Sequence, residues 1–428
     1  MKRFFILVFS FYFLVSLHAQ VSVKPYGFVR NYFTLDTRKT YTVVGGEYNM
    51  IPYDELWNED HSEDLNAVAL AQLQALSTRI GLNIEGPELL GWQSSGKVEG
   101  DFGGFGTNNT VLRLRLAYLK LVKKKTQLLV GQTWHPLSGE IMPEVLGMAA
   151  GAPFRPHSRT PQVRATQEFG FQNSACKIGY TAALLYQLQY MNNGPTSASV
   201  PTSTSSTNYA HNAIWPEAYL GFNFRNNGFT FILGADAQLL RPRTHAQIGG
   251  VTKKVDETVA SITPTAYLRF QNTNLDIQFR TLLAQNTSHL NQLCGYGVSG
   301  VNDDGSWDYA PIRNSISFLN IAYGQKVRCN LFLGFIKNLG AGEDLWLDPA
   351  TNGYHIYMKG GENFTHMNSI WRIAPSVSYN VKAFNIGLEY EITTVTYGDL
   401  GDNGAVRNND NLHQVMNHRI CALVKYNF

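Results

Sequence analysis

The sequence has few charged residues and, beyond its N-terminus, no long uninterrupted apolar segment. Charged residues make up 16% of the 428 residues, against about 25% in soluble domains. No segment after residue 17 approaches the roughly 18 consecutive apolar residues that a transmembrane helix needs. Hydrophobic residues nevertheless make up 44% of the chain, which excludes a disordered protein. The composition thus fits neither an ordinary soluble protein nor a helical membrane protein.

Cysteine is also scarce, and the motifs of common enzymes are missing. The four cysteines, Cys176, Cys294, Cys329 and Cys421, show neither close pairing nor metal-ligand spacing. A glycine-rich run, 295–300, matches a dinucleotide fingerprint, but it lies in a loop without the strand and helix that the motif requires. Most histidines occur singly in loops, and no nucleophile elbow is present. We therefore predict no enzyme, no cofactor and no metal site.

The N-terminus has the pattern of a secretory signal peptide. Lys2 and Arg3 precede an apolar run over 4–17, and a small residue, Ala19, marks a cleavage site. We predict that residues 1–19 are removed and that 20–428 form one exported domain located in a bacterial outer membrane. The mature chain would keep 33 basic and 32 acidic residues, so nothing supports a nucleic acid or another polyanion as partner.

Apolar and polar residues alternate with a period of two. Leu112, Leu114, Leu116 and Tyr118 alternate with Arg113, Arg115 and Ala117. Strict alternation is typical of a strand with one apolar and one polar face. The same pattern recurs over 74–85, 177–191, 275–284 and 384–393.

Short and long connections separate these strands. Short turns near 86–91, 123–126, 225–228, 272–274, 324–326 and 380–382 alternate with long polar loops at 37–70, 135–160, 192–214, 240–256, 286–312, 340–366 and 397–411. This rhythm predicts an all-β fold, a transmembrane antiparallel β-barrel of about 16 strands in contact with membrane lipids. The short turns would be periplasmic and the long loops extracellular.

The last ten residues, 419–428, alternate and end on an aromatic residue. This ending resembles the signal by which outer-membrane barrels are recognised for insertion, and Tyr426 and Phe428 are its predicted determinants.

Lumen-facing charges are the candidate functional residues. The predicted pore-lining set is Arg79, Arg113, Arg115, Arg155, Arg159, Arg164, Arg280, Arg372, Glu99 and Asp101. In one interpretation, opposite charges on neighbouring strands pair and hold the wall together. In the other, arginines without partners form an anion path, with Arg113 and Arg115 ~6.8 Å apart along the axis. Both interpretations remain open.

The loop 135–160 carries Glu140, Glu144, Arg155, His157 and Arg159. It either folds into the pore and narrows it or lies on the surface. A barrel of sixteen strands otherwise encloses a wide aqueous channel.

Residues 96–164 resemble the DcaP-like outer-membrane porins. The likeness rests on the segments 96–102, 112–118, 131–134 and 159–164, about a sixth of the chain. It implies a homotrimeric sixteen-stranded channel for dicarboxylates and aromatic acids, with Arg113, Arg115, Arg164 and the third loop at the constriction. Family members often carry a helical segment before the barrel, whereas here the first strand begins near Val23, so the barrel wall alone would hold a trimer. The leader ending Ala19-Gln20 resembles exports of the Bacteroidetes.

The expected function is passive diffusion of small hydrophilic solutes with a modest preference for anions such as small carboxylates. One alternative is a channel for neutral solutes or oligosaccharides that stack on Tyr26 and Phe28. A second is a non-conducting receptor or adhesion barrel whose long loops bind a partner.

Overall fold

One closed antiparallel sheet dominates the structure. The computed structural model describes residues 21–104, 110–138, 142–147, 151–171, 174–196, 203–407 and 411–428, so the predicted signal peptide 1–19 and Glu140 lie outside the described residues. The sheet contains seventeen strand segments. Two of them, β4 and β5, both pair with β1 and together make one interrupted strand, which gives the described barrel sixteen strands. The predicted all-β barrel is confirmed.

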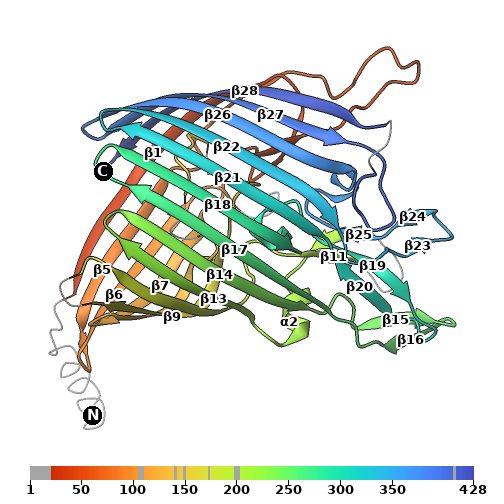
Figure 1. Ribbon diagram of the computed structural model, residues 1–428, viewed down its shortest axis with the longest axis horizontal. Helices are drawn as coiled ribbons and strands as arrows, with labels where there is room; N and C mark the ends of the chain where they lie inside the picture. Colours follow the sequence, from red (N-terminus) through yellow and green to blue (C-terminus); the bar gives the residue numbers. More distant parts are fainter. Residues whose placement is uncertain are drawn as a thin grey trace, which may run out of the picture.

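The barrel strands follow the chain order (Figure 1). They are β1 (Ser22–Asp36), β4 (Leu70–Gln74), β5 (Arg79–Leu89), β6 (Trp92–Asp101), β7 (Arg113–Lys123), β8 (Thr126–Trp134), β9 (Arg159–Gly170), β10 (Lys177–Leu185), β13 (Glu217–Asn226), β14 (Phe229–Leu240), β17 (Val259–Gln271), β18 (Leu275–Gln285), β21 (Arg313–Gly324), β22 (Val327–Gly340), β26 (Met367–Val381), β27 (Phe384–Tyr397) and β28 (His413–Asn427). Each strand pairs with its neighbours in sequence. This topology gives the backbone N–H and C=O groups the hydrogen-bond partners that lipid cannot provide.

The first and last strands close the barrel. β1 pairs with β28 over Phe28–Asp36 and Arg419–Asn427. The Phe428 amide donates to the Gly27 carbonyl at 3.1 Å, and the Gly27 amide donates back to Phe428 at 3.0 Å. Tyr426 and Phe428 are exposed on the outer wall. Their role in assembly remains a prediction.

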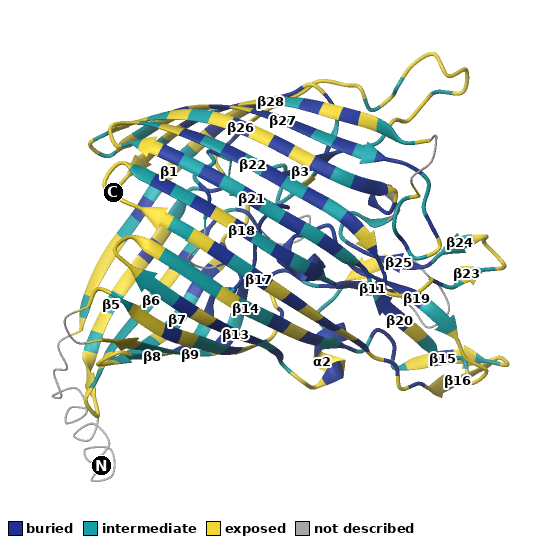
Figure 2. Ribbon diagram, in the orientation of Figure 1, coloured by how far each residue is buried: buried dark blue, intermediate teal, exposed yellow. Residues whose placement is uncertain are grey.

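The wall has one apolar and one polar face. On β27, Leu388 is 53% exposed to the outside, whereas Glu389 beside it is 3% exposed and faces inward. Figure 2 shows this alternation as bands along most strands. Slipping a strand by one residue would turn charged side chains toward lipid, at ~2–4 kcal/mol for each Lys or Arg near the midplane.

A β-bulge corrects the predicted faces of β7. The pairing of β6 with β7 shifts between Glu99 and Gly100, which leaves Arg115 as an extra residue. An inserted residue reverses the alternation beyond it. Leu114 is 50% exposed on the outer face as predicted, but Leu116 is 6% exposed and lies inside. The prediction that Leu116 and Tyr118 face lipid was therefore wrong.

Two predicted strands have different bounds. The segment 74–85 is broken between β4 and β5, where the Thr78 amide bonds to the Ala75 carbonyl and the Thr78 hydroxyl accepts from the Arg30 amide. Hydroxyl side chains often interrupt ladders in this way. The segment 177–191 ends as a barrel strand at Leu185.

All short connections lie at one end of the barrel, which we call the short-turn end. All long connections lie at the opposite end, which we call the long-loop end. The prediction missed the turn at 171–176 and the connection at 102–112. The segment 135–158 is the third long loop, as predicted. The long-loop end carries further elements: α2 (Asn208–Ala213), β11 (Asn193–Pro195), β12 (Ser203–Ser205), β15 (His245–Ile248), β16 (Val251–Lys254), β19 (Tyr296–Val301), β20 (Trp307–Pro311), β23 (Leu347–Asp348), β24 (Gly353–Tyr354), β25 (Ile356–Tyr357), η1 (Ser288–Leu290) and η2 (Gly361–Phe364). Among the described residues, no helix has the length and apolar character to cross a membrane.

Candidate functional site

The described parts of the third loop, 142–147 and 151–158, lie inside the barrel. The Leu146 amide donates to a carboxylate oxygen of Glu389 on β27 at 2.8 Å. The Glu144 amide donates to the Asn320 side chain on β21 at 2.6 Å. The ring of Phe154 packs against Phe332 on β22, 6.0 Å between centroids. The loop thus contacts the wall at several strands and narrows the lumen.

The first long loop also enters the lumen, although its polar composition did not predict this. Its hairpin consists of β2 (Thr40–Val43) and β3 (Tyr48–Pro52), and every residue of β3 is buried. The Arg372 guanidinium donates to the carbonyls of Met50 at 2.6 Å and Ala152 at 3.0 Å, so one wall arginine holds both loops. The apolar run within an otherwise polar loop was the signal that could have predicted this burial.

Five of the predicted site residues form one ion network on β5, β6 and β7. Arg113 donates two hydrogen bonds to Asp101, at 2.8 and 2.9 Å. Arg115 donates to Glu99 at 2.9 Å and also contacts Asp101. Arg79 lies 3.5 Å from Glu99. Paired guanidinium and carboxylate groups hold these strands together, as the first of the two interpretations expected.

Three other predicted arginines gather where the third loop joins β9. Arg155 and Arg159 lie over the Trp134 ring, with guanidinium carbons 5.4 and 5.0 Å from its centroid. Arg159 donates to Gln189 at 2.7 Å and to Tyr190 at 3.2 Å, and its Nη1 has no hydrogen-bond partner among the described residues. Arg280 on β18 is fully buried, and its Nε and Nη1 also have no such partner.

Several positively charged side chains lie close together in this region. Burial, with Arg280 and Arg159 nearby, lowers the pKa of Arg155 to about 9. Burial and Arg155 hold the pKa of His157 well below its usual range, so the imidazole is neutral. Arg155 donates to Nδ1 of His157 at 2.9 Å. Buried hydrogen-bond donors that lack acceptors favour the binding of an anion, because its oxygen atoms would accept from them.

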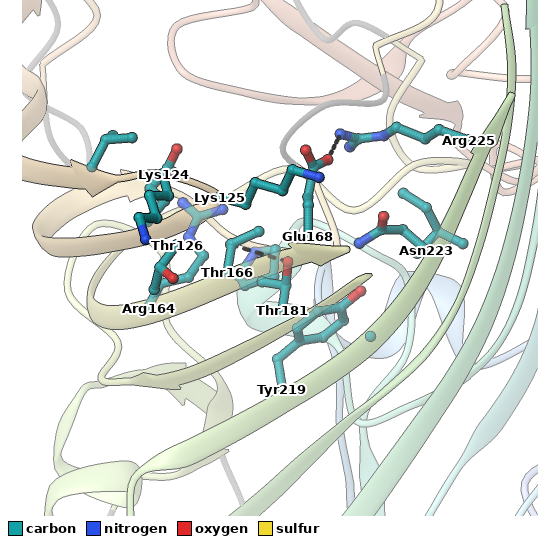
Figure 3. A pocket seen from close by; sticks show the side chains of 15 residues that line it. Lys124, Lys125, Thr126, Arg164, Thr166, Glu168, Thr181, Tyr219, Asn223 and Arg225 are labelled. Carbon is teal, nitrogen blue, oxygen red and sulfur yellow. Dashed lines mark hydrogen bonds and ion pairs between the residues drawn. The ribbon is translucent and has the colours of Figure 1, made fainter. Parts of the chain in front are cut away.

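A cavity of about 300 Å³ opens at the short-turn end, beside Arg164 on β9 (Figure 3). Lys124, Lys125 and Arg225 line it as well. Glu168 also lines it and pairs with Arg225 at 2.7 Å. The cavity therefore carries an excess of basic groups.

A second cavity, of about 490 Å³, lies toward the long-loop end. Arg113, Tyr190 and Lys359 are among its lining residues. Burial lowers the pKa of Lys359 to about 8. Along the chain direction of β7 and β9, the buried arginines Arg115 and Arg159 come between this cavity and the one beside Arg164. Lys359, Tyr190 and Trp134 were not predicted as members of the site.

The rings of Tyr26 and Phe28 are covered by cations. The Lys97 ammonium lies 4.5 Å from the Tyr26 centroid. The Phe28 ring is contacted by Arg79 at 4.8 Å and by Lys425 at 4.3 Å. These cation–π contacts occupy faces that a stacked sugar would need.

No protein-family model matches the chain, and no curated protein sequence matches it. Solved structures do match. The outer membrane channel DcaP of Acinetobacter baumannii superposes with a TM-score of 0.61, at 15% identity over 95% of this chain and 97% of that one. The barrel has the fold of DcaP. The predicted resemblance is thus confirmed as a shared fold.

Two further structures share the fold. An anion-selective porin from Comamonas acidovorans has a TM-score of 0.52 at 10% identity, covering 96% of this chain and 100% of the other. OmpT, an outer membrane protein of Vibrio cholerae, has a TM-score of 0.51 at 11% identity, covering 95% and 98%. At these identities the likeness to DcaP and to both proteins concerns architecture alone.

Proposed function

We propose that this chain is a passive outer-membrane porin for small hydrophilic solutes, with a preference for anions such as small carboxylates. The observation that carries the proposal is a file of basic side chains through the lumen. Arg113 borders the cavity toward the long-loop end, Arg159 lies in the buried layer, and Arg164 borders the cavity at the short-turn end.

The preference for anions follows from the positions of the arginine side chains that are not matched by carboxylates. Arg79, Arg113 and Arg115 each contact a carboxylate, Glu99 or Asp101, so this network keeps only one positive charge in excess and adds less selectivity than arginines without such partners. Arg159 and Arg280 keep buried donors without partners among the described residues. In a narrow lumen with low-dielectric walls, such groups attract anions, and a guanidinium offers a carboxylate two parallel hydrogen bonds.

Two observations support an anion channel over the other candidate functions. The covered faces of Tyr26 and Phe28 disfavour a path built for sugars. The barrel also shares its fold with a protein described as an anion-selective porin. The proposal includes no catalytic role, and it places the chain in the outer membrane as a homotrimer, the form in which OmpT of Vibrio cholerae has been solved.

Solute flux into proteoliposomes tests the proposal against its alternatives. Swelling should be faster with a small dicarboxylate than with a neutral sugar of similar size. Faster swelling with the sugar would support the neutral-solute channel. No flux of either solute, with correctly inserted barrels, would support a receptor or adhesion protein and contradict the porin.

A further inference from the structure

A buried group of histidines and carboxylates lies in the wall at the start of the third loop, next to Trp134, whose carbonyl accepts a hydrogen bond from Arg164. His135 follows β8, Glu217 begins β13, and His289 belongs to η1 in the loop 286–312. Nε2 of His135 lies 2.8 Å from Oε1 of Glu217, and Nε2 of His289 lies 2.9 Å from the same oxygen. Asp236 on β14 adds a carboxylate oxygen 3.7 Å from Nε2 of His135. Four separate elements thus converge on one point.

The group is sealed from solvent by an apolar shell. All four side chains are at most 4% exposed. Leu137, Leu185 and Leu290, each fully buried, form a hydrophobic cluster with Ala183 and Tyr219 around the start of β13. A compact polar centre inside an apolar shell is the arrangement found around protein metal sites, where the shell controls access and dielectric.

The group contains buried polar atoms that have no partner among the described residues. Glu217 has ion-pair contacts only with the two histidines within the part of the chain that the structure describes. Oε2 of Glu217, Oδ1 of Asp236 and Nδ1 of His289 have no hydrogen-bond partner there. Buried lone pairs that meet no donor are costly, and a divalent cation bound among these side chains would accept them.

We propose that His135, His289 and Glu217, with Asp236 as fourth ligand, bind a divalent transition-metal ion such as Zn²⁺. The ligand atoms of the first three residues lie within 4.8 Å of one another. Tetrahedral zinc with bonds of about 2.0–2.2 Å places its ligand atoms about 3.3–3.6 Å apart. Small side-chain shifts convert the observed spacing to that geometry. Two histidines with carboxylates are a ligand set that zinc accepts.

Metal binding would rearrange the root of the third loop. In the structure, Nδ1 of His135 accepts a hydrogen bond from the Leu137 amide at 3.1 Å, so the proton of the neutral ring is on Nε2. When Nε2 binds the metal, this proton moves to Nδ1. The Leu137 amide then has to turn away, and the turn 135–138 opens. The site therefore couples metal occupancy to the segment that begins the third loop.

Zinc retention by the purified full-length barrel tests the proposal. Protein is stripped with a chelator, incubated with Zn²⁺, desalted and analysed for metal content. We expect about one zinc ion per chain in the wild type and in the control His245→Ala, an exposed histidine on β15. Glu217→Gln and His289→Ala should bind zinc at least tenfold more weakly.

Two outcomes would overturn the proposal. Zinc content in the wild type no higher than in folded Glu217→Gln would show a hydrogen-bonded cluster only, and equal zinc in all variants would show adventitious binding. If the variants fail to fold, Co²⁺ loading of the wild type decides instead. A four-coordinate site gives strong visible absorption, whereas a weak spectrum of hydrated cobalt would contradict it.

Discussion

The Tyr48 hydroxyl lies 2.9 Å from Nε2 of His157, inside the barrel, where the hairpin of the first long loop meets the third. Arg155 donates to Nδ1 of His157, so the ring proton is on Nε2 and His157 donates to Tyr48. Two loops that are far apart in sequence thus form one structure that narrows the lumen, bordered by the buried arginines.

Arg372 holds this structure to the wall, and its loss should widen the pore. It donates to carbonyls of both loops and to the Thr393 hydroxyl. In Arg372→Ala both loops lose these anchors, and we expect a larger single-channel conductance with more frequent fluctuations. Removal of its buried hydrogen bonds should also cost about 3 kcal/mol of stability. Conductance equal to the wild type would show that the loops hold their positions without it.

The ion network on β6 and β7 should govern stability more than selectivity. In Asp101→Asn, Arg113 and Arg115 lose a shared buried carboxylate, which should cost about 3–5 kcal/mol. The measurement is the temperature at which the barrel unfolds in an electrophoretic mobility assay. Adding Arg113→Gln should recover part of the loss, because the unpaired charge is removed as well. If both variants unfold at the wild-type temperature, the network does not contribute to stability.

Glu47 should make anion preference depend on pH near neutrality. Burial, with Asp101 nearby, raises the pKa of Glu47 to about 7, above about 4.3 in an unfolded chain. Its contribution to stability is therefore fully present below about pH 4 and is lost as the pH rises through 7. Below 7 the carboxyl is neutral and the lumen carries one negative charge fewer.

We therefore expect anion selectivity in planar bilayers to rise as the pH falls from about 8 to about 6. Glu47→Gln should show the low-pH selectivity at both values. Glu55→Gln, an exposed site on the same loop, should behave as the wild type. A pH dependence that persists unchanged in Glu47→Gln would assign the titration to another group.

Much of the fold could be predicted because lipid imposes a strict pattern on each strand. Leu388 and Glu389 show that pattern directly, and the last strand, β28, follows it. The bulge at Arg115 could not be predicted, because an inserted residue depends on the pairing of β6 with β7 and leaves no local signal. Leu116 was therefore assigned to the wrong face.

The sequence predicted which residues of the candidate site face the lumen, but it did not predict which of them contact one another. Alternation indicated that Arg113, Arg115 and Arg280 point inward, but only the fold decides which of them meet carboxylates. The metal-binding group was missed for a similar reason: Glu217 is 82 positions from His135 and 72 from His289. The topology of the barrel brings these residues together, and no local sequence spacing predicts the group.

The reversal potential in planar bilayers under a salt gradient shows whether Arg159 and Arg280 make the channel anion-selective. The wild type should be anion-selective, and the double variant Arg159→Gln and Arg280→Gln should move close to neutral. Replacement of the paired Arg113 and Arg115 should have a smaller effect, and Arg407→Gln, an exposed loop arginine, should have none. Cation selectivity in the wild type, or an unchanged potential in the Arg159 and Arg280 double variant, would contradict the account.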